Sequence, residues 1–116
     1  MNPTDAKYKF DFTIGANDFS IGLYTLHEAP HEEILTPVML LKNGAAWDEV
    51  SRYDTLWTDL QEELSEEYLA NSMIKKFNKD LEKYSAGGEM SFNQKLGAIF
   101  LLRMVLVDEQ IVIKPI

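Results

Sequence analysis

Two histidines separated by three residues form the pattern in this chain that is most suited to chemistry. His27-Glu28-Ala29-Pro30-His31 matches H-E-x-x-H, in which two imidazoles one helical turn apart bind zinc and the glutamate is the general base. Proline lacks an amide hydrogen and disfavours helical backbone at the residue before it. The proline therefore disfavours the helical geometry that this chemistry requires.

A zinc site would also need a third ligand. The chain has no other histidine and no cysteine, so a carboxylate would have to serve, from Glu32, Glu33, Asp48 or Glu49. None of these lies at a spacing typical of such sites. We predict no catalytic residue, no bound metal and no cofactor, and we keep a small zinc hydrolase using His27, Glu28 and His31 as an alternative.

Acidic residues are concentrated between residues 48 and 67. This segment has eight carboxylates and only Arg52 to oppose them, so it holds nearly all of the net charge of −8 on the 116 residues. Such a concentration attracts cationic partners and speeds their association. If the segment forms one helix, its net charge is spaced at one per roughly 4 Å, whereas duplex DNA carries one charge per roughly 1.7 Å. The segment is therefore too sparsely charged to mimic DNA.

A helical projection from Asp48 places most of these carboxylates on one face, opposite Val50, Tyr53 and Leu64. We predict that this face and the adjacent tryptophan, a residue type enriched at interfaces, bind a partner: Asp48, Asp59, Glu62, Glu63, Glu66, Glu67 and Trp47. Two structural explanations stay open. The face is either simply solvated or paired with lysines of the following helix, namely Lys75, Lys76, Lys79 and Lys83.

Composition narrows the class of protein. The chain is 46 % hydrophobic and has no cysteine, which indicates one globular domain over residues 1–116 without disulfides, thiolate metal sites or a cysteine nucleophile. No secretory signal begins the chain, so we expect a cytoplasmic protein. The longest apolar run, residues 96–107, is shorter than the roughly 20 residues that span a bilayer. No basic, aromatic-rich patch indicates nucleic-acid binding.

Hydrophobic periodicity predicts the elements that must position these residues. Alternation over residues 8–26 predicts a β-hairpin, and the β-branched residues of 111–116 predict a closing strand. Helices are predicted over 37–42, from residue 45 to the mid-60s as one helix or two that meet near residue 58, over 69–84, and from a Ser91–Gln94 capping box onwards. The last helix is apolar nearly all round and is expected to be buried.

This order predicts an α+β domain. The N-terminal hairpin and the C-terminal strand would form a small antiparallel sheet packed against three to four helices. Neither the sheet nor the helices bring a recognised catalytic motif, so the acidic face is the strongest indication of function.

The leading hypothesis is a small acidic protein that binds a basic protein partner and is not an enzyme. We expect an inhibitor or immunity-type factor that neutralises a nucleic-acid-acting enzyme, with no direct contact to nucleic acid or membrane. The alternative is a phage or assembly-type chaperone or adaptor, since the layout of hairpin, helical middle and residues 102–109 resembles that of some tail-assembly chaperones. Self-association or an exposed apolar patch would favour this alternative.

Overall fold

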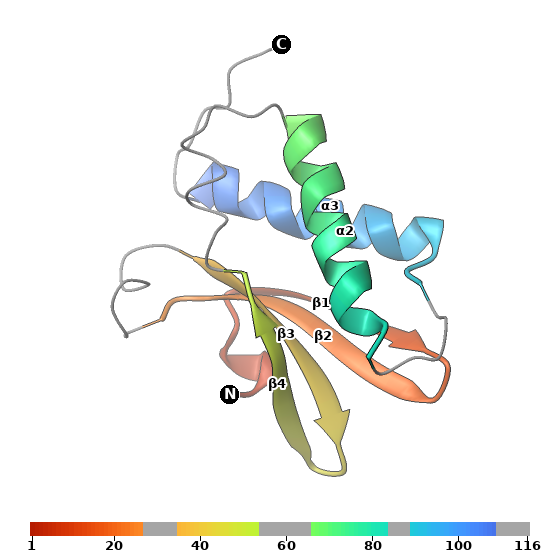
Figure 1. Cartoon of the computed structure of the whole chain (residues 1–116). Helices are drawn as coiled ribbons and strands as arrows, with labels where there is room; N and C mark the ends of the chain where they lie inside the picture. The colour runs from red at the N-terminus through yellow and green to blue at the C-terminus, as the bar shows by residue number, and fades with distance from the viewer. Residues whose placement is uncertain (27–34, 54–65, 84–88, 109–116) are drawn as a thin grey trace.

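In the part of the chain that the structure describes, the fold is a four-stranded antiparallel sheet with two α-helices across one of its faces (Figure 1). The computed structural model describes residues 1–26, 35–53, 66–83 and 89–108. The strands follow one another in the sheet in chain order: β1 (Tyr8–Ile14), β2 (Asn17–Tyr24), β3 (Thr36–Asn43) and β4 (Ala46–Arg52). The helices are a short 3-10 helix η1 (Pro3–Asp5), α2 (Glu66–Leu81) and α3 (Phe92–Asp108).

The sheet consists of two tight hairpins, β1–β2 and β3–β4, joined by antiparallel pairing of β2 with β3. Each hairpin turns through two residues, Gly15-Ala16 and Gly44-Ala45, between the paired positions on either side. The glycines have φ of 60° and 64°, a left-handed conformation that costs glycine little and that two-residue hairpin turns require. The predicted first hairpin is confirmed.

The predicted helix over residues 37–42 is wrong, because this segment is the central strand β3. Val38 and Leu40 belong to the cluster on one face of the sheet, whereas Met39 and Leu41 pack against the main core on the other. A strand buried on both faces has no polar alternation to reveal it. Asn43 and Gly44, which directly follow the predicted helix, instead lead into a hairpin turn.

The predicted helix beginning near residue 45 is also wrong in its first part, which is strand β4. Val50 and Tyr53 do face the apolar interior, but they do so from the end of a strand whose pairing is shifted by an irregularity between Met39 and Leu40. The remainder of that helix, with Trp57, and the predicted strand 111–116 lie outside the described residues.

The predicted fold class is therefore corrected in its parts. The sheet has four strands, two of them drawn from segments predicted to be helical, and the described residues contain two α-helices and not three to four. The α+β character itself is retained. Both errors have one cause, the burial of β3 on both faces, which hides its strand pattern. Because β4 is the hairpin partner of β3, missing β3 also meant missing β4.

The main core lies between the sheet and the two helices. It includes Phe19, Ile21 and Met39 from the sheet and Met73 and Phe77 from α2, each fully buried. The predicted helix over residues 69–84 is confirmed as α2, which begins three residues earlier and ends at Leu81. In the described residues no helix is long and apolar enough to cross a membrane.

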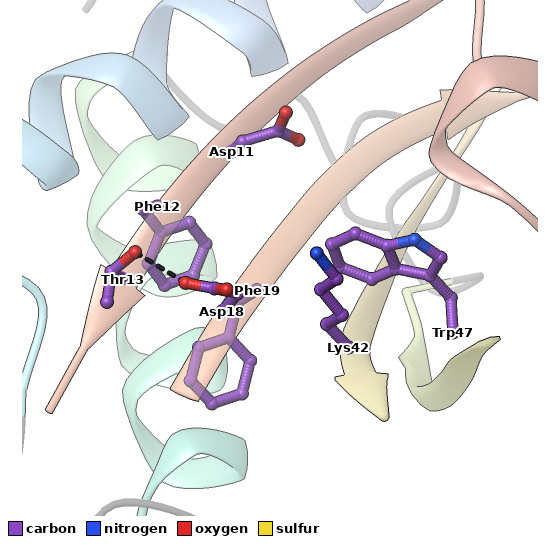
Figure 2. A pocket seen from close by; sticks show the side chains of 7 residues that line it. All are labelled: Asp11, Phe12, Thr13, Asp18, Phe19, Lys42 and Trp47. Atoms are coloured by element: carbon purple, nitrogen blue, oxygen red, sulfur yellow. Dashed lines mark hydrogen bonds between the residues drawn. The ribbon is translucent and has the colours of Figure 1, made fainter. Parts of the chain in front are cut away.

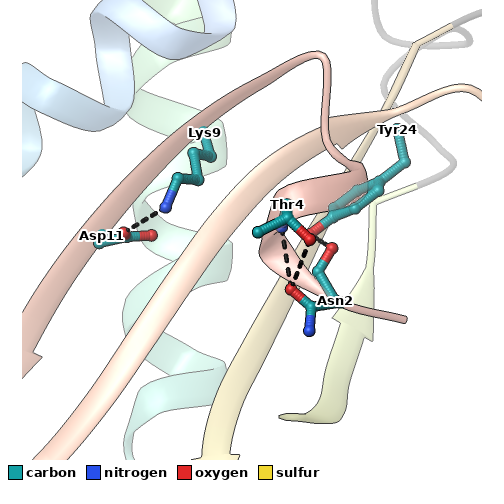
Figure 3. Close-up of polar contacts among 5 residues, drawn as sticks. All are labelled: Asn2, Thr4, Lys9, Asp11 and Tyr24. Carbon is teal, nitrogen blue, oxygen red and sulfur yellow. Dashed lines mark hydrogen bonds and ion pairs between the residues drawn. The ribbon is translucent and has the colours of Figure 1, made fainter.

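A smaller apolar cluster of Tyr24, Leu26, Val38 and Leu40 covers the opposite face of the sheet, and Ala6, at the end of η1, packs against it. The side chain of Asn2 caps η1, because its Oδ1 accepts a hydrogen bond from Thr4 N at 3.0 Å (Figure 3). The hydroxyl of Tyr24 donates to the carbonyl oxygen of Asn2 at 3.4 Å. This contact ties the N-terminus to the sheet.

Candidate protein-binding surfaces

The acidic residues predicted to share one helical face do not all lie on a helix. Asp48 is exposed on β4, where its Oδ2 accepts a hydrogen bond from Asn43 Nδ2 at 3.0 Å. Glu66 and Glu67 begin α2. Asp59, Glu62 and Glu63 lie outside the described residues. The single helical stripe is therefore a wrong prediction, because its first members belong to a strand.

Trp47 lies on the face of the sheet that points away from the helices. It pairs with Lys42 across β3 and β4 and is half-buried. Figure 2 shows these two side chains next to each other at the rim of a hollow of about 280 Å³, which is lined by Asp11, Phe12, Thr13, Asp18, Phe19, Lys42 and Trp47.

Three of the polar residues around this hollow, Asp11, Thr13 and Asp18, are hydrogen-bonded. Thr13 Oγ1 donates to Asp18 Oδ1 at 2.8 Å, and Lys9 Nζ donates to Asp11 Oδ2 at 2.7 Å (Figure 3). Trp47 also packs against the small cluster formed by Tyr24, Leu26, Val38 and Leu40. The hollow thus brings together the indole of Trp47, the ammonium group of Lys42 and the carboxylates of Asp11 and Asp18.

Among the described residues, the most exposed apolar surface lies on α3. Three large side chains spaced four residues apart are open to solvent: Phe92 is 74 % exposed, Leu96 38 % and Phe100 58 %. We call them the α3 stripe. They follow one line along the helix over about 12 Å, since each residue rises 1.5 Å. The expectation that α3 would be buried all round is wrong, because the sheet covers only one side of it.

The opposite side of α3 is fixed firmly to the fold. Ala98, Leu101 and Leu102 are buried in the main core. Gly97 lies directly on the ring of Phe10 from β1, so close that a Cβ atom at this position would overlap the ring. The absence of a side chain at residue 97 therefore sets how closely α3 approaches the sheet.

Hydrogen bonds fix the start of α3 as well. The predicted capping box is confirmed, because Ser91 N donates to Gln94 Oε1 at 2.9 Å and Gln94 N donates to Ser91 Oγ at 3.2 Å. Gln94 Nε2 also donates to the carbonyl oxygen of Thr13, at 2.9 Å, which ties the helix to the end of β1. The α3 stripe is thus presented by a rigid element.

A cation accompanies the α3 stripe. The guanidinium carbon of Arg103 lies 5.6 Å from the centre of the Phe100 ring, within the range of a cation–π contact. The position of the stripe was not predictable, although its four-residue spacing is visible in the sequence. A helix that is apolar nearly all round does not reveal which side the sheet will cover.

The H-E-x-x-H motif cannot be placed on either surface, because residues 27–34 lie outside the described part. Among the residues that are described, no three His, Cys, Asp or Glu side chains are grouped so that they could hold a metal ion.

Comparison of the chain with models of protein families, with curated proteins and with solved structures finds no match.

Proposed function

We propose that this protein binds a basic protein partner and that the α3 stripe is part of the contact surface. The observation that carries the proposal is the exposure of two phenylalanines, Phe92 at 74 % and Phe100 at 58 %, on a helix that the core holds rigidly. Aromatic side chains dominate the energetics of protein interfaces, and large contiguous exposed apolar patches mark interaction sites.

The charge of the chain determines the chemistry of the partner. At a net charge of −8 the protein attracts positively charged surfaces over distances of about a Debye length, roughly 8–10 Å at physiological salt. The carboxylates between residues 48 and 67 would speed the encounter, and the apolar contact would then slow dissociation. The net charge of the chain thus favours a basic partner over a second copy of this acidic chain.

Within this proposal the protein has no catalytic role, and we place it in the cytoplasm as an inhibitor or immunity-type factor. Enzymes that act on nucleic acid carry a positively charged surface where they contact phosphates, which an acidic protein can cover. An assembly chaperone or adaptor is the second candidate. The α3 stripe favours it too, because an adaptor binds through apolar surface without a need for opposite charge.

Helical peptides of about 18 residues, long enough to form a stable helix when bound, test the proposal directly. One carries a leucine face flanked by lysines, a second has the same face flanked by glutamates, and a third has lysines with serines in place of the leucines. Binding is measured by fluorescence anisotropy at low and high salt. We expect the first peptide to bind at least about tenfold more tightly than either of the others.

The variant Phe92→Ser/Phe100→Ser should lose at least about tenfold in affinity for the leucine–lysine peptide, because it removes both aromatic anchors. Asn93→Ser, an exposed change next to the stripe, is the matched control and should bind as the unaltered chain does. Unchanged binding by the double variant would rule out the stripe as the contact. Equal binding of the glutamate-flanked peptide would rule out charge selection and leave the adaptor function.

A further inference from the structure

The face of the sheet that points away from the helices carries a row of side chains across all four strands. Thr13 of β1 pairs with Asp18 of β2, and Lys42 of β3 pairs with Trp47 of β4. The register between β2 and β3 sets Asp18 beside Lys42 and completes the row. These four residues and Asp11 line the hollow of about 280 Å³ on this face (Figure 2).

The charged side chains of the hollow balance one another. Asp11 forms an ion pair with Lys9, whose Nζ lies 2.7 Å from Asp11 Oδ2. Asp18 and Lys42 carry opposite charges, and neither has an ion-pair partner among the described residues. The charges of these four side chains sum to zero, so the hollow does not select a ligand by net charge.

Hydrogen-bonding groups of both kinds remain available in the hollow. Asp18 Oδ1 accepts from Thr13 Oγ1 at 2.8 Å, which leaves the other carboxylate oxygen of Asp18 to accept from a ligand. The ammonium group of Lys42 has three donors and no hydrogen-bond partner among the described residues. A hydroxyl group both donates and accepts, so hydroxyls on one ligand can bond to both side chains.

Trp47 adds an apolar surface beside these polar groups. Its indole is half-buried and packs against a cluster that includes Val38 and Leu40, so its position is fixed before any ligand arrives. It lies next to Lys42 and across the hollow from the carboxylates of β1 and β2 (Figure 2). Aromatic rings have electron-rich faces and a large apolar area, which suits contact with C–H groups.

We propose that this hollow binds one ring of a neutral carbohydrate. A sugar ring carries hydroxyls around its rim and C–H groups on its faces, so it matches Asp18 and Lys42 with the first and Trp47 with the second. A charged ligand would be attracted by one of the two free charges and repelled by the other. A volume of about 280 Å³ lies just below the usual range for ligand sites, which fits a single ring.

Amide chemical shifts measured as sugar is added test the proposal. The probes are the methyl glycosides of glucose, galactose and mannose, with glycerol as a polyol without a ring and with acetate and methylammonium as charged fragments. We expect at least one glycoside to bind saturably in the millimolar range, with shifts at residues 11–13, 18–20, 42 and 47. Its affinity should not depend on salt, because the ligand is neutral. Glycerol and the two charged fragments should not bind saturably.

Two variants of the hollow test the contacts. Trp47→Ala should lower the affinity at least about tenfold, because it removes the apolar surface. Asp18→Asn/Lys42→Gln keeps that surface and the net charge, and it should lower the affinity at least about threefold because its hydrogen bonds are no longer charge-assisted. The control Lys75→Gln/Glu89→Gln also removes one positive and one negative charge, at exposed residues that do not line the hollow, and should leave the affinity unchanged.

The absence of saturable shifts with every glycoside would overturn the proposal, as would shifts confined to other residues. Equal losses in the two double variants, or tighter binding of acetate or methylammonium than of any glycoside, would overturn it as well. Because Asp18→Asn/Lys42→Gln leaves the packing of Trp47 in place, the site can be tested even if Trp47→Ala does not fold. Peptide binding at the α3 stripe is measured separately, so either proposal can fail alone.

Discussion

Helices α2 and α3 lie on the same face of the sheet and carry large apolar side chains at the same four-residue spacing, yet these side chains have opposite fates. On α2, Met73, Phe77 and Leu81 are fully buried. On α3, Phe92, Leu96 and Phe100 are exposed. Spacing alone therefore does not determine burial.

The difference comes from the other side of each helix. The outward residues of α2 are polar, with lysines at positions 75, 76 and 79. Its apolar residues therefore lie on one side, and this side packs against the sheet. Helix α3 is apolar on both sides, and the sheet takes the side that contains Ala98, Leu101 and Leu102. The apolar side chains on the remaining side stay outside the core, and exposed apolar surface of this kind is typical of a binding site.

The largest effect is expected from truncating one aromatic residue on each helix. Phe77→Ala should lower the free energy of unfolding by about 3–5 kcal/mol, because it leaves a cavity in the core beside Tyr53. Phe100→Ala should change it by less than about 0.5 kcal/mol, since the ring is mostly solvated. Urea denaturation measures both, and similar losses would show that the stripe is structural.

The close approach of α3 to the sheet gives the next largest effect. Gly97→Ala should destabilise the protein by about 1–2 kcal/mol, because overlap with Phe10 outweighs the gain of about 1 kcal/mol in helix propensity. In a Phe10→Ala background the same change should become neutral or stabilising. A double-mutant cycle by thermal denaturation measures this coupling, and a loss that is the same in both backgrounds would contradict it.

The hydrogen bond from Tyr53 to Asp80 joins the end of β4 to α2, and it is tested by removing the hydroxyl of Tyr53. Tyr53→Phe keeps the ring contact with Phe77 and deletes the hydrogen bond to Asp80, which should cost about 1 kcal/mol. A loss of less than about 0.3 kcal/mol would mean that Tyr53 fixes α2 by packing alone.

The buried hydroxyls of Tyr24 and Tyr53 predict how the free energy of unfolding depends on pH. Burial raises the pKa of Tyr24 to about 12, with the charges of Asp5 and Asp11 adding to it, and burial together with the hydrogen bond to Asp80 also raises the pKa of Tyr53. Because the unfolded chain loses these protons first, near pH 10, this contribution is complete below about pH 10 and is lost as the pH rises through the folded pKa values. Tyr53→Phe should flatten that alkaline decline, which denaturation at stepwise pH measures.

The sequence predicted the elements whose patterns are local and missed those whose environment is not. The first hairpin, α2 and the capping box of α3 are confirmed because alternation, helical spacing and the Ser91–Gln94 pair each lie within a few residues. Strand β3 was missed because it is buried on both faces and shows no alternation. The exposed side of α3 was missed for a similar reason, because the helix is apolar on both sides. Trp47 was predicted as a contact residue, but its place on the far face of the sheet was not predicted.

The order of the strands has a consequence for how the molecule folds. Every strand pairs with its neighbour in the chain, so the sheet is built from short-range contacts that form quickly. The hydrogen bond from Gln94 to Thr13 instead closes a separation of 81 residues. We therefore expect α3 to dock last, so that weakening its contact with Phe10 would mainly speed unfolding and leave the folding rate little changed.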